Sequence, residues 1–163
     1  ILAVFKEINY LTHSEFKELN ERLSLLNQQP EVLREKKKGD YLVENRMYVN
    51  AVRIYENALQ KEDKEGLGEQ FNGGIYHNMG CAYLNLFQFQ EAADCFWKAY
   101  ELLHTKQVYR HYLTASYMRN PQEFPQICRK MEVEAEEQEE IIRNLEQSAK
   151  KARKVSGEDT DGL

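Results

Sequence analysis

The sequence predicts an all-α fold built from packed helical hairpins. The chain of 163 residues holds only three prolines and eight glycines, too few for the many tight turns of an all-β domain. Large and small apolar residues recur at spacings of three and four, which places them on one side of a helix. This spacing is clearest in two neighbouring segments, 76–83 and 92–99. Hydrophobic residues make up 42% of the chain, enough for one core.

The clearest hairpin is predicted between residues 76 and 99. Its first helix carries an aromatic, a Met-Gly pair and a second aromatic on one face, and its second helix carries an Ala-Phe-Ala stripe. These residues are Tyr76, Met79, Gly80, Tyr83, Ala92, Phe96 and Ala99. Small residues on both helices allow the two backbones to approach closely, while the aromatic rings fill the space beside the contact. Because such a hairpin leaves apolar surface on its outer faces, it needs neighbours, which indicates a repeat protein.

At these residues the chain resembles the tetratricopeptide repeat family. The family's pattern is an aromatic, a Leu-Gly pair and a Tyr in the first helix, then an Ala and a Phe in the second. Asn78 also fits the usual repeat, whereas the closing Pro is absent and His104 stands near its place. The resemblance implies a right-handed superhelix of antiparallel helical hairpins. In this family the first helices of successive units line a concave groove that holds a peptide.

A second, degenerate copy of the repeat is predicted over residues 32–65. Its glycine and its small-large-small stripe have the same spacing as in the middle hairpin, at Gly39, Ala51, Tyr55 and Ala58. Lysines 36–38 occupy positions where the family has apolar residues, so the first helix is a poor copy. The two copies are 41 residues apart, longer than the family period of about 34. The excess lies in 62–74 and forms either a loop or an extra turn on the next helix.

The segments on either side of these copies are predicted to be helical as well. Residues 1–31 form an N-terminal helical extension, in which Thr12 and Glu15 make a capping box. A partial third unit ends at Asn120-Pro121, so the repeats span 32–120. From Phe124 a heptad stripe predicts one long capping or coiled-coil helix within 121–155, followed by a disordered tail at 156–163. The stripe consists of Cys128, Met131, Ala135, Gln138, Ile142, Leu145, Ala149 and Ala152.

Composition excludes several classes of function. The net charge of −5 argues against a nucleic-acid partner, whose phosphates need a basic face. Three scattered cysteines indicate a reducing compartment without a disulfide framework, hence a cytoplasmic location. No apolar run approaches the ~18 residues of a membrane span. The chain begins at Ile1 rather than Met, which is consistent with a fragment or a processed product.

The sequence contains no recognisable catalytic motif. It has no nucleophile spaced from a base, no Gly-rich phosphate loop and no His-Glu-x-x-His, so we expect no enzyme and no cofactor. His77 and Cys81 lie four residues apart on one helical face and could supply two metal ligands, but a structural zinc site needs four. No pair among Cys95, His104 and His111 has a recognised zinc spacing. We therefore expect no metal site, and we expect the glutamates of 132–140 to form a solvated face.

The resemblance implies which residues line the groove. By matching register they are Lys36, Asp40, Val43, His77, Asn78, Cys81, Asn85 and His111, with Val108 and Ala115 beside the last. Some family members clamp a terminal carboxylate with Lys and Asn side chains. Asp40 stands where such a clamp carries Asn, and its negative charge would oppose a carboxylate. Each groove position is equally compatible with a plain solvated residue.

These expectations lead to one main hypothesis and two alternatives. The main hypothesis is a non-enzymatic protein–protein interaction module that binds a peptide or protein segment in the groove. In the first alternative, the C-terminal heptad helix forms a homodimer and the groove is idle. In the second, the chain is a sensor or regulatory segment of a longer protein.

Overall fold

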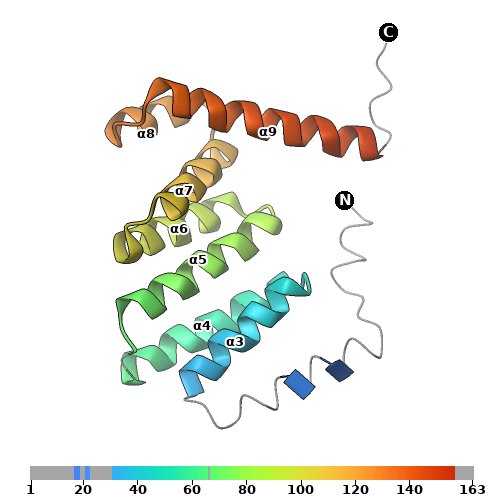
Figure 1. Ribbon diagram of the computed structural model, residues 1–163, viewed down its shortest axis with the longest axis vertical. Helices are drawn as coiled ribbons and strands as arrows, with labels where there is room; N and C mark the ends of the chain where they lie inside the picture. Colours follow the sequence, from blue (N-terminus) through green and yellow to red (C-terminus); the bar gives the residue numbers. More distant parts are fainter. Residues whose placement is uncertain (1–16, 19–20, 23–30, 66, 157–163) are drawn as a thin grey trace. The chain divides into compact units, whose positions relative to one another are not determined.

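The computed structural model describes residues 17–18, 21–22, 31–65 and 67–156, and within these ranges the chain is helical with no strand (Figure 1). The named helices are α3 (Glu31–Glu44), α4 (Tyr48–Glu65), α5 (Glu69–Asn85), α6 (Phe89–Leu103), α7 (Lys106–Arg119), α8 (Phe124–Lys130) and α9 (Ala135–Ser156). The all-α prediction is confirmed. The predicted capping box and residues 157–163 of the predicted disordered tail lie outside the described residues, as does most of the N-terminal extension. Ser156, predicted as the first residue of that tail, is instead the last residue of α9.

Helices α3 and α4 form the first hairpin. Asn45 donates its side-chain amide to the Tyr41 carbonyl over 2.8 Å, which satisfies an acceptor at the end of α3. Arg46 then adopts a left-handed conformation with φ 60°, and the chain reverses into α4. The predicted stripe of Ala51, Tyr55 and Ala58 is fully buried.

Helices α5 and α6 form the second hairpin, with the same arrangement. Phe87 supplies the left-handed residue of the connection, with φ 59°. The predicted stripe of Ala92, Phe96 and Ala99 is fully buried on α6. Both stripes predicted from spacing therefore face the interior of their hairpins.

One close contact is repeated in both hairpins. A Cβ atom at Gly39 would lie 2.5 Å from a ring carbon of Tyr55, and a Cβ atom at Gly80 would lie 2.8 Å from a ring carbon of Phe96. Both separations are shorter than any van der Waals contact, so each glycine allows an aromatic ring to rest on the helix backbone. The two hairpins are therefore in register across both of their helices.

Most of the extra residues between the two copies lengthen the two helices rather than forming a loop. Helix α4 continues to Glu65 and α5 already begins at Glu69, so both helices are longer than the repeat requires. Gly73 and Gly74 lie inside α5, where each costs roughly 1 kcal/mol relative to Ala. Gly73 is buried, and a Cβ atom there would lie 2.5 Å from Leu103 Cγ. Gly73 thus lets α5 approach the end of α6 closely.

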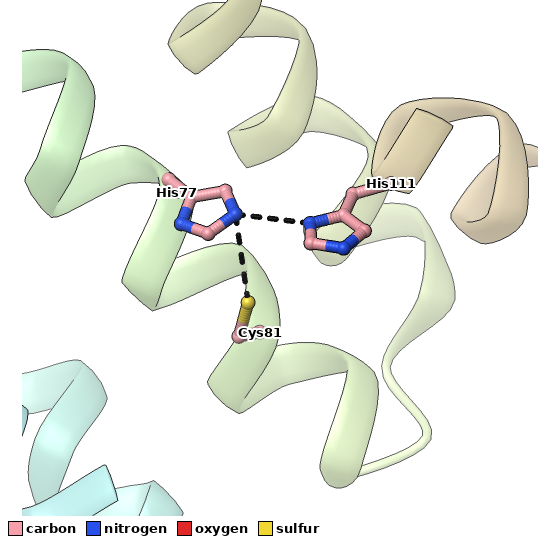
Figure 2. A group of neighbouring side chains, drawn as sticks. All are labelled: His77, Cys81 and His111. Atoms are coloured by element: carbon pink, nitrogen blue, oxygen red, sulfur yellow. Dashed lines mark hydrogen bonds between the residues drawn. The ribbon is translucent and has the colours of Figure 1, made fainter. Parts of the chain in front are cut away.

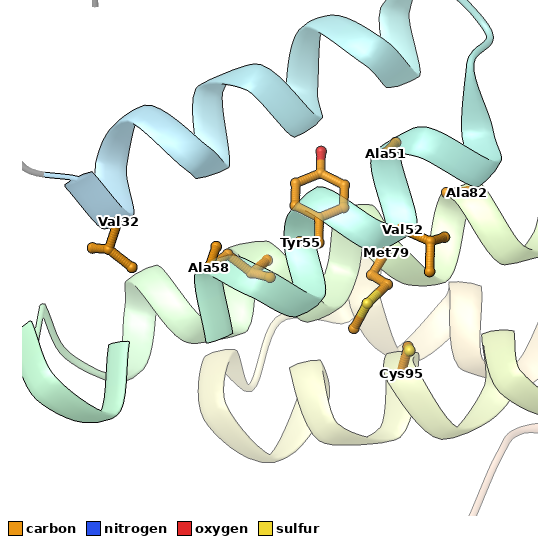
Figure 3. Close-up of a cluster of buried hydrophobic side chains, with 9 residues drawn as sticks. Val32, Ala51, Val52, Tyr55, Ala58, Met79, Ala82 and Cys95 are labelled. Atoms are coloured by element: carbon orange, nitrogen blue, oxygen red, sulfur yellow. The ribbon is translucent and has the colours of Figure 1, made fainter. Parts of the chain in front are cut away.

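A core cluster of buried side chains joins the two hairpins (Figure 3). Helix α4 packs against both α3 and α5, so its buried stripe contributes to contacts on two sides. The cluster draws one residue from α3, four from α4, three from α5 and one from α6. They are Val32; Ala51, Val52, Tyr55 and Ala58; Ile75, Met79 and Ala82; and Cys95.

The chain divides into two compact units between Tyr112 and Leu113, inside α7. In the second unit Phe124 and Cys128 are buried, and the Tyr117 ring meets the Phe124 ring edge-on at 5.3 Å between centroids. The prediction of one continuous helix from Phe124 is wrong, because α8 ends at Lys130 and α9 begins at Ala135.

The break between α8 and α9 has a local cause. Glu132 adopts a left-handed conformation with φ 55°, and Val133 N donates to the Cys128 carbonyl over 2.9 Å while Glu132 N donates to the Arg129 carbonyl over 3.2 Å. This pair of bonds is a Schellman closure, which usually places Gly at the left-handed position. Since Glu132 occupies that position here, the sequence carried no stop signal.

The heptad stripe predicted for this region is also only partly followed by burial. Ala135 and Ala149 are exposed, and Ile142 and Leu145 are half-buried. Ile141, which the stripe omitted, is 4% exposed and supplies the buried contact of α9. None of the helices in the described ranges combines the length and the apolar character that crossing a bilayer requires.

Candidate functional site

The residues predicted to line a groove come from three helices of the first unit. Helix α3 carries Lys36, Asp40 and Val43; α5 carries His77, Asn78, Cys81 and Asn85; and α7 carries His111. All are half-buried except Asn85, which is exposed. Val108 and Ala115 were also predicted for the groove, but both are buried, so that part of the prediction is wrong. Six of them are joined by direct side-chain contacts, and we call this set the polar row: Lys36, Asp40, Asn78, His77, Cys81 and His111.

Two of the predicted residues have other roles. Val43 packs against the hydrophobic core cluster. Asn85 donates its side-chain amide to the carbonyl of Cys81 over 2.8 Å, which satisfies an acceptor in the last turn of α5. The structure therefore places neither side chain in the polar row.

Asp40 is the centre of one end of the row. Its Oδ2 accepts a hydrogen bond from Lys36 Nζ over 2.8 Å. Its Oδ1 accepts two more, from the Tyr55 hydroxyl over 2.5 Å and from Asn78 Nδ2 over 2.8 Å. Burial raises the pKa of Tyr55 far above its usual range, and the hydrogen bond to Asp40 raises it further. Tyr55 therefore stays protonated and holds the carboxylate in place.

Asn78 fixes the tautomer of His77. Because its Nδ2 donates to Asp40, its Oδ1 is the amide atom that faces His77 Nδ1, 3.2 Å away. A carbonyl oxygen can only accept, so Nδ1 carries the hydrogen. In the neutral ring the other nitrogen, Nε2, then presents a lone pair.

The lone pair of His77 points at two further side chains (Figure 2). His111 Nδ1 lies 2.9 Å from His77 Nε2, and Cys81 Sγ lies 4.0 Å from the same atom. The two imidazole rings meet edge to edge, with centroids 5.1 Å apart and planes inclined by 18°. The ring of Phe96 lies against both, at 5.8 Å from His77 and 5.4 Å from His111. The buried aromatic of α6 thus forms an apolar wall behind the two histidines.

The surroundings of His111 and Cys81 favour the neutral form of each side chain. Burial lowers the pKa of His111, and the neighbouring His77 and Arg110 lower it further. Burial raises the pKa of the Cys81 thiol to about 11. Both shifts disfavour the charged forms, because burial penalises a charge in either side chain.

In the described part of the chain, the group His77, Cys81 and His111 is the one set of His, Cys, Asp or Glu side chains close enough to share a metal ion. One ligand atom from each lies within 4.8 Å of the others. Imidazole nitrogen and thiolate sulfur are both zinc ligands. The arrangement can therefore bind a metal, and it can also donate or accept hydrogen bonds at its exposed edge.

Searches of protein-family models, of curated proteins and of solved structures found nothing that matches this chain. The assignment of function therefore depends on the residues themselves.

The sequence located most of the polar row but not how its members connect. The sequence predicts Tyr55 only as a member of the core stripe. Its hydroxyl is the signal that could have linked it to the polar row, since the matching position of the second hairpin holds Phe96, which has none. His111 was placed on the row but not beside His77 and Cys81. It follows His77 by 34 residues, a separation that has no meaning for metal binding until the helices are placed.

Proposed function

We propose that this chain is a non-enzymatic protein-interaction module of the tetratricopeptide type. In this proposal α3, α5 and α7 are the first helices of successive repeats, arranged in a right-handed superhelix. Two features support the assignment. The glycine-under-aromatic contact recurs in both hairpins, and His77 and His111 are separated by 34 residues, the length of one tetratricopeptide repeat.

The observation that carries the proposed function is the polar row itself. Its side chains come from three different helices, they are only half-buried, and each is held by a contact with the next. A row of polar groups that is fixed in advance binds a peptide at a lower entropic cost than a row of mobile groups. The proposed ligand is therefore a peptide or protein segment that lies across α3, α5 and α7.

The charges of the row indicate what kind of segment it accepts. Lys36 and Asp40 are its two formally charged residues, and they pair with each other, with side chains 21% and 29% exposed. The pair leaves no unmatched cation for a terminal carboxylate. We therefore propose recognition through hydrogen bonds to uncharged groups of the segment, centred on His77 and Asn78.

A capture experiment tests this function. The wild-type chain and the double variant His77→Ala/Asn78→Ala are immobilised and exposed to a native extract. We expect the double variant to lose at least about tenfold in capture of the partner, because two hot-spot contacts of ~1 kcal/mol or more are removed. The matched control is Glu101→Ala, an exposed position on α6. Circular dichroism checks that all three proteins have the same helix content.

Unchanged capture by the double variant would remove the polar row from the binding surface. Equal losses of capture for the double variant and for Glu101→Ala would show that the loss is not specific to the polar row. Cys81, Cys95 and Cys128 are free thiols, which suits the reducing compartment that we propose for this chain. The extract should therefore be cytoplasmic and kept reduced.

Self-association through α9 is a second candidate. Ile142 and Leu145 are half-buried and Ala149 is exposed, so one stripe on this 22-residue helix is only partly covered. Paired helices would cover it. Sedimentation velocity over a series of concentrations decides the matter, because a monomer at the highest concentration rejects self-association.

A further inference from the structure

We propose that His77, Cys81 and His111 bind one divalent transition-metal ion, Zn²⁺ in the first instance, in a site with three protein ligands and an open fourth position. The site lies on the proposed binding face, but the inference does not depend on a peptide partner. It rests on the separations, the tautomers and the surroundings of these three side chains.

The separations suit a tetrahedral ion. With Zn–N bonds of about 2.0–2.1 Å and Zn–S bonds of about 2.3 Å, neighbouring ligand atoms stand about 3.3–3.6 Å apart. The observed separations lie on either side of this range, at 2.9 Å between the two nitrogens and 4.0 Å between Cys81 Sγ and His77 Nε2. All three ligand atoms lie within 4.8 Å of one another. Rotation about side-chain bonds is enough to bring them to an ion.

The hydrogen bonds of the group show what the ion would replace. The single lone pair on His77 Nε2 faces two donors, His111 Nδ1–H and the Cys81 thiol. When Zn²⁺ takes that lone pair, Cys81 binds as the thiolate and releases one proton to water. The proton on His111 moves through solvent from Nδ1 to Nε2, so that Nδ1 can bind the ion. One proton is released for each Zn²⁺ bound.

A second shell already orients the central ligand. Asp40 accepts from Asn78, and Asn78 Oδ1 accepts from the Nδ1–H of His77. Metal-bound histidines almost always donate their other N–H to a carboxylate, a carbonyl or water, which fixes the ring and makes the coordinating nitrogen more basic. Here the amide of Asn78 links the imidazole to the carboxylate. The Phe96 ring shields the other side of both histidines.

The ligand types select the class of ion. One thiolate and two imidazoles suit Zn²⁺, whereas Mg²⁺ and Ca²⁺ prefer oxygen ligands. Since His77 and Cys81 lie on α5 and His111 on α7, a bound ion ties two helices together. The fourth position is open to water, as in zinc sites that are not purely structural.

Cobalt(II) titration tests the site in the isolated chain. The protein is stripped with a chelator and kept reduced, and Co²⁺ is then added while the absorption spectrum is recorded. We expect a thiolate-to-cobalt charge-transfer band and intense tetrahedral ligand-field bands that saturate at one ion per chain. Zn²⁺ should displace the cobalt, and excess Mg²⁺ should not.

Variants assign each ligand. Cys81→Ser should abolish the charge-transfer band, and His111→Ala should weaken Co²⁺ binding by more than tenfold. Asn78→Ala should weaken it about 10–100-fold through the second shell. The matched control is His104→Asn, because His104 is exposed and left-handed with φ 52°, a conformation that Asn tolerates. This variant should bind as the wild type does.

Three results would overturn the proposal: a wild-type chain without the charge-transfer band at saturating Co²⁺, a band that survives Cys81→Ser, or equal losses for His104→Asn and His111→Ala. The first result needs only the wild-type chain, and the second needs Cys81→Ser, which replaces a single atom. Both results therefore stand even if His111→Ala misfolds. Since no partner is present, failure here leaves the capture experiment valid, and failed capture leaves the metal titration valid.

Discussion

The two hairpins of the first unit have the same interior and different faces. Inside, Gly39 lies under Tyr55 in the first hairpin, and Gly80 lies under Phe96 in the second. Both aromatics are fully buried. The interior is repeated because close packing of two helices leaves few solutions: a glycine on one helix and a large ring on the other.

On the face, matching positions carry different chemistry. Lys36 and Asp40 of α3 form an ion pair within one helix. At the matching positions of α5, His77 and Cys81 instead turn toward His111 on the next helix. The difference teaches that packing constrains the inside of each hairpin, whereas the half-buried residues on its face are free to differ.

The largest expected effect comes from emptying the shared interior. Phe96→Ala should lower the free energy of unfolding by about 3–5 kcal/mol, because it removes a fully buried ring and leaves a cavity. Urea denaturation followed by circular dichroism measures the loss. The control is Phe87→Ala, a residue that is 56% exposed, which should cost at most about 0.5 kcal/mol. Equal losses would show that α6 is not packed as described.

The next effect removes a difference between the two interiors. Tyr55→Phe removes the hydroxyl and leaves the first hairpin with the same ring that Phe96 supplies in the second. Since Asp40 then loses one donor to its half-buried carboxylate, we expect the free energy of unfolding to fall by about 1.5–3 kcal/mol. Tyr83→Phe is the matched control, because its hydroxyl reaches an exposed Glu56 only at 3.4 Å. A Tyr55→Phe loss no larger than the control's would mean that Asp40 does not need this bond.

The sequence predicted the interior better than the site for a physical reason. Helical packing repeats every three or four residues, so the buried stripe of each hairpin is visible locally in the chain. The row of polar residues follows from the resemblance to the repeat family, carried over by matching register. The contact between His77 and His111 joins separate helices, and no local spacing encodes it.

The C-terminal region shows the other limit of prediction from sequence. Spacing alone continued the helix through Glu132, since nothing there resembles a stop. The break is closed by the backbone bond from Val133 N to the Cys128 carbonyl, to which the side chain of Glu132 contributes no atom. Helical periodicity cannot predict that a residue other than Gly, here Glu132, adopts the left-handed conformation that ends a helix.

Smaller effects come from adding one methyl group to a helical glycine. Gly39→Ala and Gly80→Ala each push a Cβ atom into a ring. Overpacking costs about 1–3 kcal/mol and the better helix propensity of Ala returns about 1, so we expect a net loss of up to about 2 kcal/mol. At Gly74 the nearest atom is the flexible end of Lys36, 3.4 Å away. Gly74→Ala should therefore stabilise the chain by about 0.5–1 kcal/mol. Stabilisation by all three would refute the close contacts.

The smallest effect is absent at neutral pH and appears only in alkali. Burial, and after it the nearby acidic residues Asp94, Glu56 and Glu91, raise the pKa of Cys95 from its ordinary 9.0 to about 12. The unfolded chain therefore loses this proton first, so stability that is fully present below pH 9 falls as the pH rises toward 12. The matching position of α4 holds Ile54, which cannot ionise, so the effect belongs to the second hairpin.

Cys95→Ala should flatten the fall in unfolding free energy between pH 9 and pH 11, measured by urea denaturation against the wild type. The two curves should remain parallel between pH 6 and pH 8, where neither state ionises this thiol. Curves that stay parallel up to pH 11 would show that the Cys95 thiol ionises in the native chain as readily as in the unfolded one.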